Sequence, residues 1–116
     1  MKELTIINKR NSIYIGKVRV ADKFTTRLKG LLGSRTLSSF NGLLLKPCKQ
    51  VHTIGMRYSL SIWYVDKKLR IVKIVDDLKP NKISPYVNDS HLIIEFPQRW
   101  AEITGSKEGD LLDVYL

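Results

Sequence analysis

The densest group of chemically reactive side chains in this 116-residue chain lies between residues 48 and 56. Cys48, His52 and Met56 follow one another at intervals of four residues. A thiolate, an imidazole and a thioether are ligands of blue-copper sites, and His91 could complete such a set or, with a recruited carboxylate, a zinc set. Against copper, the second histidine of cupredoxins lies upstream of the loop, whereas His91 lies downstream. A metal site is therefore the weaker interpretation of this segment, and we expect no bound metal or cofactor.

The same segment could instead hold a thiol nucleophile. His52 would act as the base for Cys48, and the nearby Lys46 and Lys49 would favour the reactive thiolate. No oxyanion-binding loop or orienting acid stands nearby in the sequence. The simpler interpretation is that Cys48 is a small buried residue beside Pro47 and that His52 is a hydrogen-bonded histidine of the core or its rim.

Paired carboxylates for hydrolysis are hard to find. Asp76 and Asp77 are adjacent, so in a strand they point to opposite faces. Glu95 lies within an apolar run and on the same strand face as His91, which allows a His–Glu site or, more simply, a buried ion pair with an arginine. The chain has no glycine-rich phosphate loop and no dinucleotide fingerprint.

Length and composition indicate one globular domain spanning residues 1–116. The chain is 43% hydrophobic and 27% charged, which is ordinary for a folded protein. A single cysteine permits no intrachain disulfide and favours a reducing compartment. Neither a signal peptide nor a window of about 18 apolar residues is found, so we expect a cytoplasmic protein without a membrane span.

Positive charge is concentrated in the first half of the chain. The net charge is +9, and residues 1–60 hold 12 of the 20 Lys and Arg residues but only two acids. Such asymmetry can attract an acidic partner, although charges scattered singly also serve solubility alone. A basic β-rich domain could also bind single-stranded nucleic acid by stacking bases on aromatic side chains. The candidates for stacking are Tyr14, Tyr58, Trp63, Tyr64 and Tyr86.

Short β-branched and apolar runs separated by turn residues predict mostly strands. The expected strands cover 4–7, 13–20 with a bulge at Gly16, 42–46, 60–66, 69–75, 91–96 and 111–115. A two-residue turn, 67–68, joins the central pair. Apolar residues at helical spacing predict a main helix over about 22–33, and Pro97 opens a short second helix over about 97–104. The fold class is α+β, mainly β, with a compact antiparallel sheet or small barrel.

Four successive blocks resemble the domain of unknown function 192 family. They are 27–33 (RLKGLLG), 42–48 (GLLLKPC), 51–57 (VHTIGMR) and 62–66 (IWYVD), followed by Pro80, 94–97 and 109–110. The resemblance implies a compact β-rich domain with an early helix and no established activity. Some members are associated with secretion or pilus-assembly systems. The matching positions supply the site candidates Arg27, His52, Met56, Arg57, Asp66 and Glu95. Ser61 departs from the family, which usually carries an acid there.

The leading hypothesis is a non-catalytic binding or interaction domain. Loops held between rigid strands commonly carry function, and the polar loop 47–57 lies between two buried strands. We expect this loop to contact a protein partner or an acidic ligand. The alternatives are a basic nucleic-acid-binding domain and a thiol- or metal-dependent enzyme.

Overall fold

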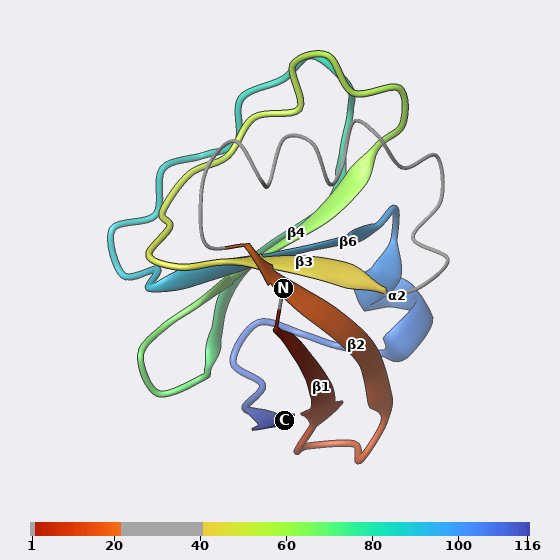
Figure 1. Ribbon diagram of the computed structural model, residues 1–116, viewed down its shortest axis with the longest axis vertical. Helices are drawn as coiled ribbons and strands as arrows, with labels where there is room; N and C mark the ends of the chain where they lie inside the picture. The colour runs from red at the N-terminus through yellow and green to blue at the C-terminus, as the bar shows by residue number, and fades with distance from the viewer. Residues whose placement is uncertain (1, 22–40) are drawn as a thin grey trace.

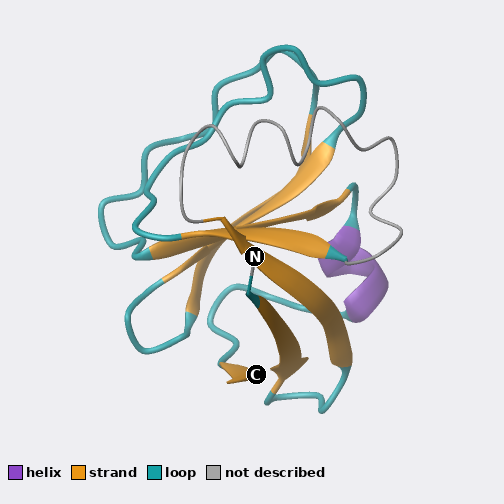
Figure 2. Ribbon diagram, in the orientation of Figure 1, coloured by secondary structure: helices purple, strands orange, loops and turns teal. Residues whose placement is uncertain are grey.

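The computed structural model describes residues 2–21 and 41–116, so Arg27 and the helix expected over 22–33 lie outside the described residues. The strands form one seven-stranded sheet in the order β5-β4-β6-β3-β2-β1-β7 (Figure 1). Their bounds are β1 Glu3–Asn8, β2 Tyr14–Ala21, β3 Gly42–Leu45, β4 Leu60–Val65, β5 Ile71–Leu78, β6 Leu92–Pro97 and β7 Leu112–Tyr115. The helix α2, Trp100–Thr104, stands at one end of the sheet (Figure 2).

The sheet is mixed, which corrects the expectation of an antiparallel one. Strands β2 and β3 pair in parallel, while the other neighbours pair antiparallel. A parallel pair needs a crossover of a dozen or more residues, and the stretch 22–41 is long enough to supply it. The bulge expected at Gly16 is confirmed, because the register between β1 and β2 shifts beside it.

The sheet curls until its two outermost strands meet at one end. Ile71 N donates to Asp110 O at 2.8 Å, and Gly109 N donates to Ile71 O at 2.7 Å. Leu112 N donates to Leu69 O at 2.9 Å. The strands therefore make a half-barrel, and the expected fold class, α+β and mainly β with a small barrel, is confirmed. The short helix expected over 97–104 is present as α2.

Two hydrophobic clusters lie on opposite faces of the central strands β3, β4 and β6. Inside the curl, the ring centroids of Trp63 and Phe96 are 4.6 Å apart, and Trp100 of α2 stacks on Phe96 at 6.3 Å. The outer face carries a second cluster, which includes Leu43, Leu60, Ile62, Tyr64 and Ile93. Burial on both faces explains why these strands read as nearly continuous apolar runs rather than alternating ones.

A buried polar chain connects β4 to α2. Trp63 Nε1 donates to Ser61 Oγ at 2.9 Å, and Ser61 Oγ donates to Asp76 Oδ1 at 2.6 Å. The Asp76 carboxylate also accepts from the backbone nitrogens of Ala101 and Glu102, the first turn of α2. Arg99, at the N-cap position, makes no side-chain capping bond, so Asp76 caps the helix from β5. Ser61 is thus a buried link in this chain.

The outer edge of β5 is covered by the segment that leads into β7. Besides the contacts of Ile71, Ile74 N donates to Glu108 Oε2 at 3.0 Å. Arg99 N donates to Asp76 O at 2.8 Å. Four backbone groups on this edge of β5, those of Ile71 N and O, Ile74 N and Asp76 O, are therefore bonded within the chain.

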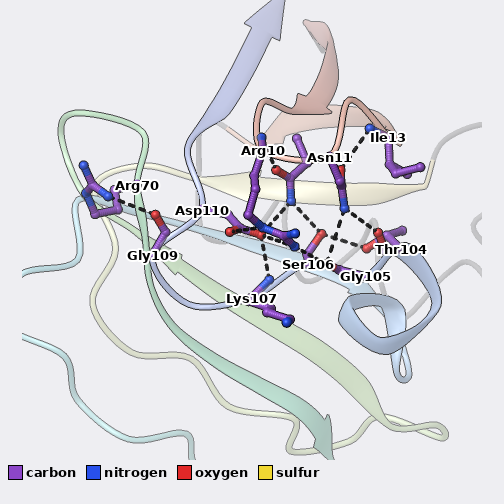
Figure 3. A network of polar contacts seen from close by, with 11 residues as sticks. Arg10, Asn11, Ile13, Arg70, Thr104, Gly105, Ser106, Lys107, Gly109 and Asp110 are labelled. Carbon is purple, nitrogen blue, oxygen red and sulfur yellow. Dashed lines mark hydrogen bonds and ion pairs between the residues drawn. The ribbon is translucent and has the colours of Figure 1, made fainter.

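Asp110 forms the centre of a polar network that fastens the end of β1 to residues 104–110 (Figure 3). Its carboxylate accepts hydrogen bonds from Asn8 Nδ2 at 2.8 Å, Arg10 Nε at 2.7 Å and Lys107 N at 2.8 Å. Ser106 Oγ accepts a further bond from Asn8 Nδ2. Asp110 is buried, so each of these bonds also satisfies a group that is shielded from water.

This network predicts acid-sensitive stability. Burial by itself raises the pKa of Asp110, but the hydrogen bonds from Arg10, Asn8 and Lys107 outweigh it, so the pKa lies below its ordinary value. The folded protein therefore holds the carboxylate deprotonated more strongly than the unfolded chain does. The stabilisation is fully present above the unfolded pKa of about 4 and is lost as the pH falls through the lower folded pKa.

We expect Asp110→Asn to lower the free energy of unfolding by about 1–3 kcal/mol at about pH 7. The difference from wild type should shrink as the pH falls below the unfolded pKa of about 4 and then through the lower pKa of the folded carboxylate. Urea unfolding of both proteins across this range is the measurement. A difference that stays constant with pH would contradict the role assigned to the charged carboxylate.

Candidate functional site formed by two paired loops

Two long loops, 46–59 and 79–91, run side by side across the outer face of the sheet; together they are called the loop platform here (Figure 1). Backbone bonds join them along their length. Thr53 N donates to Lys82 O at 2.8 Å, Ser84 N to Val51 O at 2.8 Å, and Val87 N to Lys49 O at 3.0 Å. His52 and Ile83 form an antiparallel bridge. The two loops therefore behave as one irregular ribbon rather than as separate flexible segments.

Thr53 joins the two loops through hydrogen bonds of its side chain and its backbone. Its side chain is fully buried, and its hydroxyl donates to Lys79 O at 2.5 Å and accepts from Lys82 N at 3.0 Å. Its backbone carbonyl accepts from Asn81 N and Met56 N. One side chain thus satisfies two backbone groups of the opposite loop, which fixes the register of the platform.

The platform is also fastened to the sheet beneath it. Tyr64 on β4 is fully buried, and its hydroxyl donates to Pro85 O at 2.6 Å. Burial raises the pKa of this phenol, so Tyr64 remains the neutral donor that the contact requires. Two further bonds join the loops to each other: Ser84 Oγ accepts from Val51 N at 2.9 Å, and Cys48 N donates to His91 O at 3.0 Å.

Burial along the first loop alternates, so that Val51 and Thr53 turn inward while His52 and Ile54 turn outward. Ile54 is 56% exposed, and on the second loop Ile83 is 66% and Tyr86 62% exposed. Three large apolar side chains therefore stand on the platform rather than under it.

The platform is basic. The loop 46–59 contains Lys46, Lys49 and Arg57 and no acid, and the loop 79–91 contains two lysines and one acid, Asp89. Both histidines of the chain also lie in these loops. The excess of positive charge in the sequence is therefore also found on the loop platform.

Three of the sequence-derived candidates belong to the first loop but have different surroundings. His52 is half-buried, and its Nδ1 accepts from Ile54 N at 3.2 Å, so the imidazole is not sealed within the core. Met56 is buried and packs into the outer hydrophobic cluster. Arg57 is exposed. His52 and Arg57 therefore face the surface, while Met56 supports the loop from below.

Glu95 lies in β6 and is fully buried. It points to the same side of the sheet as Ile93, which belongs to the outer cluster. Burial raises the pKa of Tyr58, and the negative charge of Glu95 raises it further, so this carboxylate lies close to the end of the first loop. Glu95 is placed beneath the platform rather than on it.

Asp66 serves the turn between β4 and β5. Its Oδ1 accepts from the backbone nitrogens of Lys68 and Arg70 at 2.9 and 3.0 Å. The expectation of a two-residue turn at 67–68 is wrong: the turn has three residues, and Leu69 takes a left-handed conformation (φ 68°). Since the six residues of β4 span roughly 20 Å, Asp66 and Arg57 lie at opposite ends of that strand and do not converge.

The structure bears on the alternative functions as well. Cys48 is half-buried and its thiol contacts Gln50 O at 3.4 Å. No group of three or more His, Cys, Asp or Glu residues that could hold a metal ion is found within 2–21 and 41–116. Trp63 and Tyr64 are fully buried, so neither can stack on a base.

Several platform residues were not singled out from the sequence. Thr53 was visible only as part of the His-Thr-x-Gly-Met block, and its reach to Lys79 and Lys82 depends on a loop 26 to 29 residues away. Ile83 lies in a stretch with no strand or helix period, so nothing marked it as exposed, whereas Tyr86 in the same stretch was named only as an aromatic side chain that could stack on a base. Asn81 at positive φ, whose Oδ1 accepts from Gly55 N, follows Pro80 and was the one available turn signal.

These features define a class of protein: a small β-rich half-barrel that carries two mutually bonded loops on its outer face. The chain belongs to the domain of unknown function 192 family, whose model, described as "Uncharacterized ACR", matches residues 5–114. No match was found among the curated proteins.

Two solved structures share the fold. One is a protein of unknown function from Novosphingobium aromaticivorans DSM 12444, with 18% identity and a TM-score of 0.74 over 96% of this chain and 83% of that one. The other, from Sinorhizobium meliloti 1021, is described as a "putative transcription regulator", with 16% identity and a TM-score of 0.76 over 97% of this chain and 92% of that one. At such low identity the likeness concerns the fold alone. Within the described residues, no helix is long and apolar enough to cross a membrane.

Proposed function

We propose that this protein is a non-catalytic binding module whose loop platform docks onto an acidic surface of another protein. The observation that carries the proposal is the exposure of three large apolar side chains, Ile54, Ile83 and Tyr86, on loops that are tightly bonded to each other. Exposed apolar groups held on a rigid support are typical of protein-binding surfaces.

Preorganisation of the two loops would favour binding. Because Thr53 and Tyr64 already fix the loops, the ordering of the backbone would cost little when a partner binds. Tyrosine and arginine are enriched among the residues that dominate binding energy at protein interfaces, and the contacts around them exclude water. Tyr86, Ile83 and Ile54 would supply the buried contact area.

The charges indicate the kind of partner. Five lysines and arginines but one acid lie in the two loops. An acidic partner would be attracted over a longer range than an apolar contact can act, and a like-charged one would be repelled. Association with a secretion or pilus-type assembly system, which the family resemblance implies for some members, is a setting in which such a partner would be met.

The test compares a change on the loop platform with a change elsewhere on the surface. Ile54→Asp with Ile83→Asp places negative charge on the apolar part of the platform, and we expect affinity for the partner to fall at least about tenfold. Ile103→Asp is the control, since Ile103 is also 66% exposed but lies on α2. Crosslinking from a photoreactive residue at position 86 identifies the partner in cells, and titration of the purified partner then gives the affinities.

The proposal also predicts that association slows as salt concentration rises, since exposed charges are screened. A partner that binds the platform variant as tightly as wild type would overturn the assignment. So would an equal loss of affinity in the Ile103→Asp protein, because that change leaves the platform intact.

A further inference from the structure

A second site lies away from the exposed apolar residues, and we infer that it binds phosphate-bearing anions. It is a depression of about 570 Å³ between the turn that joins β4 to β5 and the end of the second platform loop, and it is called the hairpin pocket here. This inference does not depend on the proposed protein-binding role, because none of Ile54, Ile83 and Tyr86 lines the pocket.

The composition of the hairpin pocket is unusual. Ligand pockets are ordinarily lined mainly by apolar and aromatic side chains with a few polar groups. All nine residues that line this depression are polar or charged. A ligand with a large apolar body would gain nothing here by burial, so the pocket suits a small and strongly hydrated ion or the ionic part of a larger molecule.

The sign of the charge points to an anion. Four cationic residues, Lys49, Lys67, Lys68 and Arg70, face two carboxylates, and His91 adds an imidazole. One of the carboxylates, Asp66, already accepts two backbone hydrogen bonds from its own turn. The positive charge therefore exceeds the negative charge at the mouth of the pocket.

The cations are placed by the fold rather than by chance. Lys49 Nζ donates to Asn88 O and, at 3.1 Å, to Ser90 O, so it ties the first loop to the wall formed by the second. An ammonium group has three donors, which leaves one for a ligand. Arg70 donates through one nitrogen to Gly109 O at 2.9 Å, which steadies a guanidinium that has further N–H groups.

The turn presents the other two cations. Asp66 holds the turn by bonding the backbone nitrogens of Lys68 and Arg70, while Lys67 and Lys68 are exposed at its tip. Lysine binds phosphate as a point charge, and arginine binds it through paired hydrogen bonds. A phosphate monoester carries about −1.5 to −2 charge at pH 7 and three acceptor oxygens, more of each than a single carboxylate, so clustered lysine and arginine residues favour phosphate.

Pyrophosphate is the probe for the test, because it carries the proposed chemistry without a base or sugar. Titrated into ¹⁵N-labelled protein, it should shift the backbone amide signals of residues 66–70 and 88–91, with half-saturation at about 1 mM for an exposed ionic site. Lys67→Gln with Lys68→Gln should weaken binding roughly fivefold to tenfold.

A matched pair of changes separates a site from net charge. Lys79→Gln with Lys82→Gln removes the same charge from exposed lysines that do not line the pocket, and we expect it to leave pyrophosphate binding within about twofold of wild type. Equal weakening by both pairs, or shifts scattered over the surface, would overturn the inference, as would no shift at all. Ile54→Asp with Ile83→Asp should leave this binding intact, so the two proposals fail separately.

The source of the phosphate is resolved by a second arm. A single-stranded oligonucleotide that shifts the same amides, and that pyrophosphate displaces, would support the site with nucleic acid as the source. An oligonucleotide that leaves those amides unmoved while pyrophosphate shifts them would support a small phosphorylated molecule.

Discussion

Replacing Trp63 by alanine is expected to lower the free energy of unfolding by about 3–5 kcal/mol, the range for loss of a large buried aromatic residue. Trp63 is fully buried inside the half-barrel, and its ring packs against Phe96 with centroids 4.6 Å apart. The change would leave a cavity inside the half-barrel beside Phe96 and would remove the donor to Ser61 Oγ. Proteins of this size are stable by roughly 5–15 kcal/mol, so this loss would remove a large fraction of the free energy of unfolding.

Trp63→Phe separates packing from hydrogen bonding. Phenylalanine keeps an aromatic ring beside Phe96 but cannot donate to Ser61, so we expect a smaller loss of about 1–3 kcal/mol. Urea unfolding monitored by circular dichroism gives both values. Because Ser61 leads through Asp76 to the first turn of α2, both variants should also weaken amide protection at Ala101 and Glu102. Unchanged protection there would show that the polar chain does not couple β4 to α2.

The second large effect is expected at Thr53. Thr53→Val keeps the shape of the side chain but removes the hydroxyl that bonds Lys79 O and Lys82 N. Two backbone groups would lose their partner at a partly buried position, and leaving one such group unsatisfied costs about 1–3 kcal/mol when it is shielded from water. We expect a total loss of about 2–4 kcal/mol, concentrated in the loop platform.

Thr53→Ser is the matched control, since it retains the hydroxyl and removes only a methyl group. Hydrogen exchange should speed up at the amides of residues 81, 82 and 84 in Thr53→Val and far less in Thr53→Ser. If partner binding follows this order, the rigidity of the platform contributes to affinity. If Thr53→Val leaves hydrogen exchange in residues 79–84 as slow as in wild type, the Thr53 hydroxyl does not hold the two loops together.

The sequence predicted the strands well where their apolar runs are continuous. Strands β4 and β6 are buried on both faces, and local composition alone indicates this. The parallel pairing of β2 with β3 was not predictable, because it depends on a crossover rather than on the residues of either strand. The turn after β4 was placed correctly but given the wrong length, since Leu69 occupies a conformation that side chains rarely adopt.

The candidate site was only partly predictable, for a related reason. The loop 46–59 stood out because it concentrates His52, Cys48 and Met56 between two strands. Its counterpart, 79–91, has no such signature, and the pairing of the two is made by backbone atoms and by two hydroxyls, those of Thr53 and Ser84. Arg57 and Asp66 end two successive blocks of the family resemblance, yet β4 separates them.

The cover on the edge of β5 has a consequence for how the protein behaves at high concentration. Cross-β aggregates grow from an unpaired edge strand that can pair with another chain. An exposed edge at β5, with the apolar Ile71 and Ile74, would favour such pairing. Glu108 and Asp110 occupy that edge from within the same molecule. Fibril nucleation at β5 would first require residues 105–110 to detach from this edge. Conditions that protonate the Asp110 carboxylate and weaken its hydrogen bonds should therefore shorten the lag before fibrils form.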